Sequence, residues 1–300
     1  MKCAFVFPGQ GSQTIGMGKD FYDNTEIGKK LFDSADEILG YSLSQMCFEG
    51  PAEELNLTIN TQPALYTVSV MAGMAAKEKG FQPCVCAGHS AGEYAALCLG
   101  GAFSFEDGLK LIAKRAAFMN ECAKNNPGKM AAVLNLDYDK IKEILSGIKG
   151  ICVAANINSL VQTVISGEAA ACEEAMEKCK EAGAKRVVPL NVSGAFHSPL
   201  MKEAAEKLKG ELDSIEFRKT EIPVIANYTA DFEWEPEIIK DNLIKQITGS
   251  VRWVETCEKM KDMGVETAFE CGAGTVLCGL IRKTTPEITG KKISAVADFE

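Results

Sequence analysis

The sequence predicts an α/β protein in which a core built on a parallel sheet is interrupted by a small inserted subdomain. A short apolar strand enters the pattern Gly-x-Ser-x-Gly at 88–92, and a helix-like segment follows at once. Residues 128–190 have a β-α-β-β-α-β order of their own, which is the order of a ferredoxin-like unit. Strands and helices then alternate again. We therefore expect one core from 1–127 and 191–300, with 128–190 as the insert.

The chain carries enough apolar sequence to bury one large core. Of its 300 residues, 46% are hydrophobic and 24% are charged, which is typical of a folded globular protein. The net charge of −9 disfavours nucleic acid as the main partner, because phosphate contacts need a basic face. The start of the sequence has neither a signal-peptide pattern nor an apolar stretch that could span a membrane. We therefore expect a cytoplasmic protein that binds neither nucleic acid nor membrane.

Cysteine and histidine are distributed in a way that argues against a metal site. The 12 cysteines lie mostly in apolar runs and never in Cys-x-x-Cys spacing, and there are only 2 histidines. This pattern is typical of buried, reduced thiols rather than of disulfides or zinc ligands. We expect no bound metal.

The elements before the insert follow from apolar periodicity and turn residues. An apolar strand at 3–7 enters the glycine-rich loop 8–13, which matches neither a P-loop nor a dinucleotide-binding pattern. This loop is either a plain connection or a site loop that carries the Gln10 amide. The remaining expected elements are helices at 25–39 and 51–55, a long helix opening at 61–65 with Pro63 at its first position and continuing to Ala76, a strand at 81–87, and helices at 91–99 and 105–125.

The patterns of the insert and of the last third of the chain each predict a mixture of strands and helices. In the insert we expect strands at 130–134, 151–156, 163–166 and 186–189 and helices at 138–146 and 169–182. After it we expect a helix from Pro199, a strand at 223–226, helices at 237–246 and 251–263, a strand at 265–269, a helix at 276–283 and a closing strand at 293–296.

Ser90 is the candidate nucleophile. A serine hydroxyl becomes reactive when a sharp strand-to-helix turn presents it, and Gly88 and Gly92 remove the side chains that would clash in such a turn. The same turn directs the backbone N–H of Ala91 to the start of a helix, where an oxyanion is favoured.

Two polar residues on apolar helices each allow two interpretations. Arg115 falls on the apolar stripe of its helix, so its guanidinium either reaches back to water or binds an anion such as a carboxylate. Gln62 is either a residue of a helix entry or part of a site.

His197 is the candidate base because the chain offers so few alternatives. An activated serine needs a base that titrates near neutrality, and the only histidines are His89 and His197. His89 adjoins Ser90 in the tight turn, so its side chain should project away from the hydroxyl. His197 stands in a loop just before a helix that begins at Pro199.

Four blocks together resemble one enzyme family. The segments Phe-Pro-Gly-Gln-Gly-Ser-Gln at 7–13, Gly-His-Ser-Ala-Gly-Glu at 88–93 and Ala-Phe-His-Ser at 195–198, with Arg115 inside a helix, occur in the order and spacing of malonyl-CoA:acyl-carrier-protein transacylases. The similarity spans essentially the full chain. It implies an α/β-hydrolase-like core with the ferredoxin-like insert as one wall of the cleft, and ping-pong transfer of a malonyl group in fatty acid synthesis.

The resemblance also implies how the reaction would run. His197 takes the proton of Ser90, and Ser90 attacks the malonyl thioester. The backbone N–H groups of Gln10 and Ala91 then hold the tetrahedral oxyanion, as an oxyanion hole does. Coenzyme A leaves, and the phosphopantetheine thiol of the acyl carrier protein takes the malonyl group.

Further residues match family positions that bind substrate or orient the base. Arg115 matches the position that binds the free carboxylate of malonate, and Gln62 matches a glutamine lining the same pocket. Gln246 matches the position whose backbone carbonyl orients the histidine. Phe196, beside the base, should crowd a branched α-carbon and so favour malonyl over methylmalonyl.

The expected partners are malonyl-CoA and an acyl carrier protein, with no separate cofactor, and the chain is expected to act as a monomer. Lys185 and Arg186 are candidates for docking the acidic carrier, although they could simply solvate a strand start. Where many relatives carry Pro-Gly, this chain has Asn-Ser-Leu-Val-Gln at 158–162, so that loop is expected to differ. A serine esterase or thioesterase, and a non-catalytic carrier-binding module, are the alternative functions.

Overall fold

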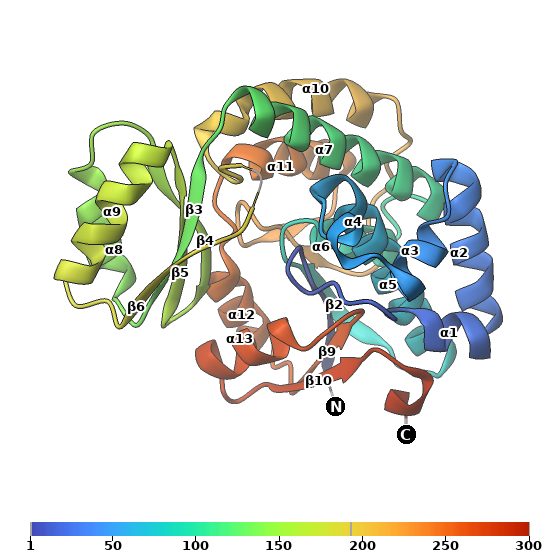
Figure 1. The fold of residues 1–300 in the computed structure, drawn as a ribbon. Helices are drawn as coiled ribbons and strands as arrows, with labels where there is room; N and C mark the ends of the chain where they lie inside the picture. The colour runs from blue at the N-terminus through green and yellow to red at the C-terminus, as the bar shows by residue number, and fades with distance from the viewer. Residues whose placement is uncertain (1, 193, 300) are drawn as a thin grey trace.

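The computed structural model describes residues 2–192 and 194–299, which build two separate β-sheets (Figure 1). The larger sheet has six strands in the order β10-β9-β1-β2-β7-β8. Every neighbouring pair is parallel except β7 and β8, which pair antiparallel at one edge. Its strands are β1 (Cys3–Phe7), β2 (Pro83–Gly88), β7 (Val224–Ile225), β8 (Phe232–Glu233), β9 (Thr267–Cys271) and β10 (Thr289–Ile293).

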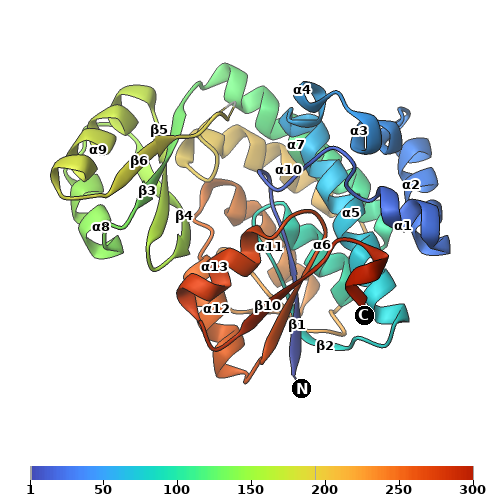
Figure 2. The same cartoon turned by 60° about the horizontal axis from the view of Figure 1, so that its bottom comes forward.

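Helices cover both faces of this sheet, which explains why its central strands are apolar throughout. Successive side chains of a strand point to opposite faces. Phe5 and Phe7 of β1 accordingly pack into the larger apolar cluster, with α2, α5, α6 and α7, whereas Ala4 and Val6 pack with α12 and α13. Figure 2 shows α12 and α13 together on their side of the sheet.

The core helices are as follows: α1 (Lys19–Asn24), α2 (Glu26–Leu39), α3 (Leu43–Glu49), α4 (Ala52–Leu55), α5 (Thr58–Glu78), α6 (Gly92–Gly100), α7 (Phe105–Asn125), α10 (Lys202–Asp213), α11 (Pro236–Thr248), α12 (Trp253–Asp262) and α13 (Val276–Thr284). Short 3₁₀ turns occupy Pro199–Met201 and Val296–Phe299. None of the helices in the described part of the chain is long and apolar enough to cross a membrane.

The second sheet is antiparallel and lies at one end of the molecule with two helices on its outer face (Figure 1). Its strand order β4-β5-β3-β6 is that of a ferredoxin-like unit, and it has an apolar cluster of its own. The elements are β3 (Lys129–Leu134), α8 (Tyr138–Ser146), β4 (Cys152–Ser159), β5 (Gln162–Gly167), α9 (Ala169–Glu181) and β6 (Arg186–Pro189). Domain boundaries at 127/128 and 190/191 stay a prediction.

The predicted fold class is confirmed, and the errors lie in short or polar elements. The sequence predicts the closing strand at 293–296, but the strand β10 runs from Thr289 to Ile293. Its exposed lysines interrupt the apolar pattern of an edge strand. The helices α1 and α3 and the two-residue strand β8 were missed, because each is too short to establish a period.

Pro63 was placed at the first position of its helix, but α5 begins at Thr58 and Pro63 lies inside it. Proline has no N–H, so the carbonyl of Ile59 loses its helical partner.

Candidate active site

Ser90 stands in a tight turn between β2 and α6, with a positive φ of 52°. A Cβ added at Gly88 would lie 2.0 Å from the carbonyl carbon of Gly92, and one added at Gly92 would lie 2.1 Å from the carbonyl oxygen of Phe7. Both contacts are with backbone, which cannot move aside. The two glycines therefore allow the chain to hold Ser90 in a strained turn with its hydroxyl directed into the site.

The imidazole of His197 is hydrogen-bonded to the hydroxyl of Ser90. Nε2 of His197 lies 2.7 Å from Oγ of Ser90. Nδ1 of His197 lies 2.8 Å from the backbone carbonyl oxygen of Gln246, which can only accept a hydrogen bond. Nδ1 therefore carries the hydrogen, and Nε2 is left to accept the hydrogen of the serine hydroxyl. His89 points elsewhere, with Nε2 2.7 Å from Oδ1 of Asn158 on β4.

Arg115 is buried, with 1% of its surface exposed, so the interpretation that it reaches back to water is wrong. Nη1 donates to Oε1 of Gln62 at 2.6 Å. Nη2 donates to Oε1 of Gln246 at 2.8 Å and to Oγ of Ser90 at 3.2 Å. No side-chain partner of Arg115 is a carboxylate within the described ranges, and its Nε finds no acceptor there. Although burial lowers its pKa, a guanidinium starts from so high a value that it stays charged.

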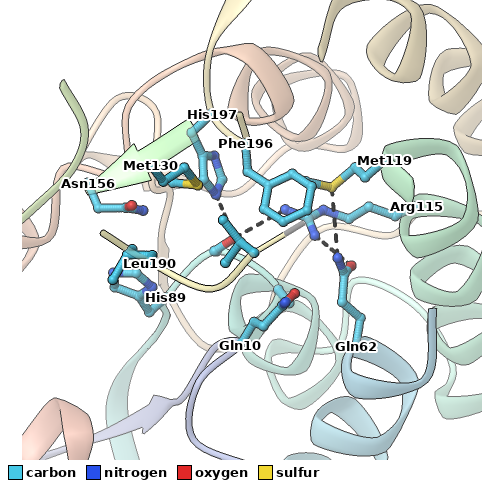
Figure 3. A pocket seen from close by; sticks show the side chains of 13 residues that line it. Gln10, Gln62, His89, Arg115, Met119, Met130, Asn156, Leu190, Phe196 and His197 are labelled. Carbon is cyan, nitrogen blue, oxygen red and sulfur yellow. Dashed lines mark hydrogen bonds between the residues drawn. The ribbon is translucent and has the colours of Figure 1, made fainter. Parts of the chain in front are cut away.

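These side chains surround one pocket between the two sheets (Figure 3). The core supplies the reactive groups, and β3 and β4 of the second sheet supply Met130 and Asn156. The pocket is lined by Gln10, Gln62, His89, Ser90, Ala91, Arg115, Met119, Met130, Asn156, Leu190, Val192, Phe196 and His197. Of the predicted site residues only Gln246 stays outside this lining, directly behind it.

Two backbone donors face the same pocket as Ser90. The N–H groups of Gln10 and Ala91 donate to no acceptor within residues 2–192 and 194–299. Ala91 caps α6, where the helix dipole favours negative charge. The side chain of Gln10 points away and donates to Oγ1 of Thr58 at 3.2 Å. Of the two groups of Gln10, the backbone N–H is therefore the one without an acceptor among the described residues.

The surroundings of His197 hold it in the neutral form. Burial lowers the pKa of its imidazole to about 3, and the positive charge of Arg115 adds to the effect. Both causes disfavour the charged imidazolium. The imidazole is thus neutral at physiological pH, and an anion bound to Arg115 would raise its pKa.

Sequence reasoning missed a residue that holds the turn. Oδ1 of Asn227 accepts the backbone N–H of Ser90 at 2.6 Å, and its Nδ2 donates to the carbonyl of Gly88 at 2.5 Å. Asn227 lies just after β7, which is next to β2 in the sheet. The pairing of β7 with β2 brings Asn227 to the turn of Ser90, and no local sequence pattern predicts this contact.

The described residues hold no group of three or more His, Cys, Asp and Glu side chains suited to a metal ion. Comparison with known proteins then identifies the family. A family model for the acyl transferase domain matches residues 4–297. The malonyl CoA-acyl carrier protein transacylase of Bacillus subtilis (strain 168) is 47% identical, with all of this chain and 94% of the relative aligned. This chain belongs to the malonyl CoA-acyl carrier protein transacylase family.

Other members of the transacylase family agree in sequence and in structure. The protein of the same name from Staphylococcus aureus (strain MRSA252) is 40% identical over all of this chain and 97% of its own length. The solved structure of the transacylase from Coxiella burnetii has a TM-score of 0.97 at 37% identity, covering 100% and 96% of the two chains. A malonyl-transacylase in complex with a type II polyketide acyl-carrier protein has a TM-score of 0.96 at 38% identity, covering 100% and 98%.

The turn around Ser90 should not tolerate a methyl group. We expect Gly92→Ala to lower the free energy of unfolding by about 3 kcal/mol or more, because the new Cβ meets backbone. Gly210→Ala in α10 is the matched control. Nothing lies within 4 Å of its added Cβ, so alanine should raise stability by about 0.5–1 kcal/mol. Urea unfolding measures both, and equal losses would contradict the prediction.

The charge of Arg115, after burial, should contribute to the lowered pKa of His197. In Arg115→Met the imidazolium no longer faces a buried cation, so the pKa of His197 should rise toward its ordinary value. NMR titration of the labelled imidazole measures it. Arg218→Met, which removes an exposed guanidinium, should leave the titration unchanged. A fall in the pKa of His197 on loss of Arg115 would refute this account.

Proposed function

We propose that this chain transfers a malonyl group from malonyl-CoA to the phosphopantetheine thiol of an acyl carrier protein, through an ester on Ser90. The observation that carries the proposal is the buried guanidinium of Arg115 at 3.2 Å from the nucleophilic oxygen. A cation fixed so close to Ser90 suits an acyl group whose far end, a few atoms from the thioester, is a carboxylate. Malonyl is such a group.

The first half-reaction forms the ester. His197 takes the hydroxyl proton on Nε2 while Oγ of Ser90 bonds to the thioester carbonyl carbon. The carbonyl oxygen becomes negative and is stabilised by the N–H groups of Gln10 and Ala91. The carbon–sulfur bond then breaks, and coenzyme A leaves as a thiol with the proton from His197.

The second half-reaction reverses these roles. The carrier thiol gives its proton to Nε2 of His197 as its sulfur attacks the malonyl ester. The same two N–H groups hold the second oxyanion. The carbon–oxygen bond breaks, and His197 returns the proton to Ser90. The hydrogen bond from Nδ1 to the carbonyl of Gln246 supports this role, because it keeps one tautomer through both steps.

Selection of the acyl group rests on Arg115, Gln62 and Phe196. A malonyl carboxylate can take a bidentate position on the guanidinium, whereas acetyl would leave that charge facing apolar atoms, at a cost of a few kcal/mol. The bond to Gln62 at 2.6 Å supports a fixed guanidinium plane. Phe196 borders the pocket beside the base and narrows the space around the α-carbon.

The remaining assignments are proposals of the same kind. Residues 128–190 form a subdomain, an assignment supported by their separate apolar cluster. Lys185 and Arg186, both exposed at the start of β6, dock an acidic carrier protein. The chain acts as a monomer without a cofactor. It works in the cytoplasm, where its 12 free cysteines would stay reduced.

Intact mass separates the proposal from its alternatives. Brief exposure to malonyl-CoA should add one malonyl group to the wild-type chain and none to Ser90→Ala, which should also lose about 1,000-fold or more of transfer activity. Adding the holo carrier protein should move the group to the carrier. Release of free malonate instead would indicate a thioesterase, and no adduct would indicate a binding module.

Replacing the aromatic ring beside the base tests selectivity. We expect Phe196→Ser to raise acylation by methylmalonyl-CoA about tenfold relative to malonyl-CoA, because the added space accepts a branched α-carbon. The ratio of the two acylation rates measures the effect. An unchanged ratio would contradict the role given to Phe196.

A further inference from the structure

Two buried carboxyls lie behind the turn of Ser90, and the reaction above does not use them. Glu93 is the second residue of α6 and Glu233 ends β8; both are 0% exposed. Oε2 of Glu93 accepts the backbone N–H of Asn227 at 2.8 Å and Nε2 of Gln246 at 3.0 Å. Oε2 of Glu233 accepts Nδ2 of Asn242 at 3.0 Å.

The other oxygen of each carboxyl has no hydrogen-bond partner in the described ranges. The two carboxyls are near enough for each to shift the pKa of the other. Two buried carboxyls in such proximity are favoured when one of them carries a proton, because two ionised carboxylates repel and can only accept. Glu93 accepts two N–H groups near Arg115 and is the ionised partner. Glu233 has one neutral amide donor and carries the proton.

The buried surroundings of Glu93 and Glu233 favour the protonated form of a carboxyl. Burial raises the pKa of both groups, that of Glu93 to about 7 and that of Glu233 well above its usual range. The other charged and titratable groups that face them are Arg115 of α7, which favours the ionised form of Glu93, and Tyr94 of α6. Burial raises the pKa of Tyr94 as well, so its hydroxyl stays neutral.

Gln246 connects this pair to the reacting groups. Its Nε2 donates to Oε2 of Glu93 and to the carbonyl of Ser90, each at 3.0 Å. Its Oε1 must therefore face Arg115, and its backbone carbonyl holds His197. An amide side chain can turn over, which would point its N–H₂ at the guanidinium. An ionised carboxylate on one side prevents this, because it accepts hydrogen bonds and cannot donate.

We propose that Glu93 and Glu233 are positioning residues that share one proton, and that ionised Glu93 fixes Gln246 and, through it, both Arg115 and His197. This inference rests on the proposed function. As pH falls through the pKa of Glu93, at about 7, the carboxylate gains a proton and the arrangement loosens. Acylation by malonyl-CoA should therefore decline on the acid side near that pH. His197, with its pKa lowered to about 3, cannot cause the decline.

Variants of the two glutamates test the pair. Glu233→Leu removes the proton donor that favours ionised Glu93, so the acid limb of acylation should move up by about one pH unit or more, whereas Glu233→Gln keeps a neutral donor and should leave the limb in place. Glu93→Gln removes the charge, so the acid limb should disappear and kcat/KM at pH 8 should fall about tenfold or more. Glu270→Gln is the matched control. Glu270 is also buried, but it binds the N–H groups of Leu277 and Cys278 on α13, and its loss should not move the limb.

The measurement is single-turnover release of coenzyme A from malonyl-CoA between about pH 5 and 9. An acid limb that stays in place in Glu233→Leu, or that moves equally in Glu270→Gln, would overturn the inference. A wild-type chain that releases no coenzyme A at any pH would instead overturn the proposed function.

Infrared spectroscopy gives a second test that needs no activity. The wild-type protein at pH 8 should show the carbonyl stretch of a protonated carboxylic acid, assigned by isotope labelling of glutamate. The band should be lost in Glu233→Gln and kept in Glu270→Gln. Its absence from the wild-type protein would overturn the shared proton, whether or not the variants fold.

Discussion

A buried positive charge is the constraint around which this molecule is built. Removing a guanidinium from water costs several kcal/mol unless polar groups replace the lost hydration. Here Arg115 from α7 receives oxygens from Gln62 on α5, Gln246 on α11 and Ser90 in the turn before α6. The nearby negative charge, on Glu93, acts through the amide of Gln246 rather than by contact. The cation is thus stabilised by its neighbours, and no carboxylate of residues 2–192 and 194–299 contacts it directly.

The large sheet brings these contributors to one place. The carboxyl ends of parallel strands meet at one edge of a sheet, where α/β proteins bind ligands. The Ser90 turn follows β2, Gln10 follows β1, and Asn227 follows β7, which borders β2. Residues that are far apart in the sequence are therefore brought to the same edge of the sheet, because each one directly follows its strand. The second sheet adds a wall of the pocket through Met130 and Asn156, whereas Ser90 and His197 lie outside this sheet.

The sequence was most informative where one residue type is scarce or a pattern is periodic. Long helices, the central strands and the order of the insert follow from apolar period, and His197 follows from there being two histidines to choose from. The strand β8 and the polar edge strand β10 carry too weak a pattern. The sequence did not decide whether the guanidinium of Arg115 reaches water or is buried. Helical spacing shows which face of the helix a residue occupies, but not which hydrogen-bond acceptors lie opposite that face. The roles of Asn227 and of the Glu93–Glu233 pair depend on tertiary contacts. They cannot be predicted before the neighbouring strands of the sheet are known.

The bond between His89 and Asn158 joins the turn of the nucleophile to the hairpin of the second sheet. Asn156, on the same strand β4, forms an isolated β-bridge with Val251, just before α12. On the neighbouring strand β5, Oγ of Ser166 donates to the backbone carbonyl of Phe196 at 2.7 Å, next to His197. The second sheet is therefore attached to both segments that carry Ser90 and His197, so a displacement of this sheet would disturb both residues together.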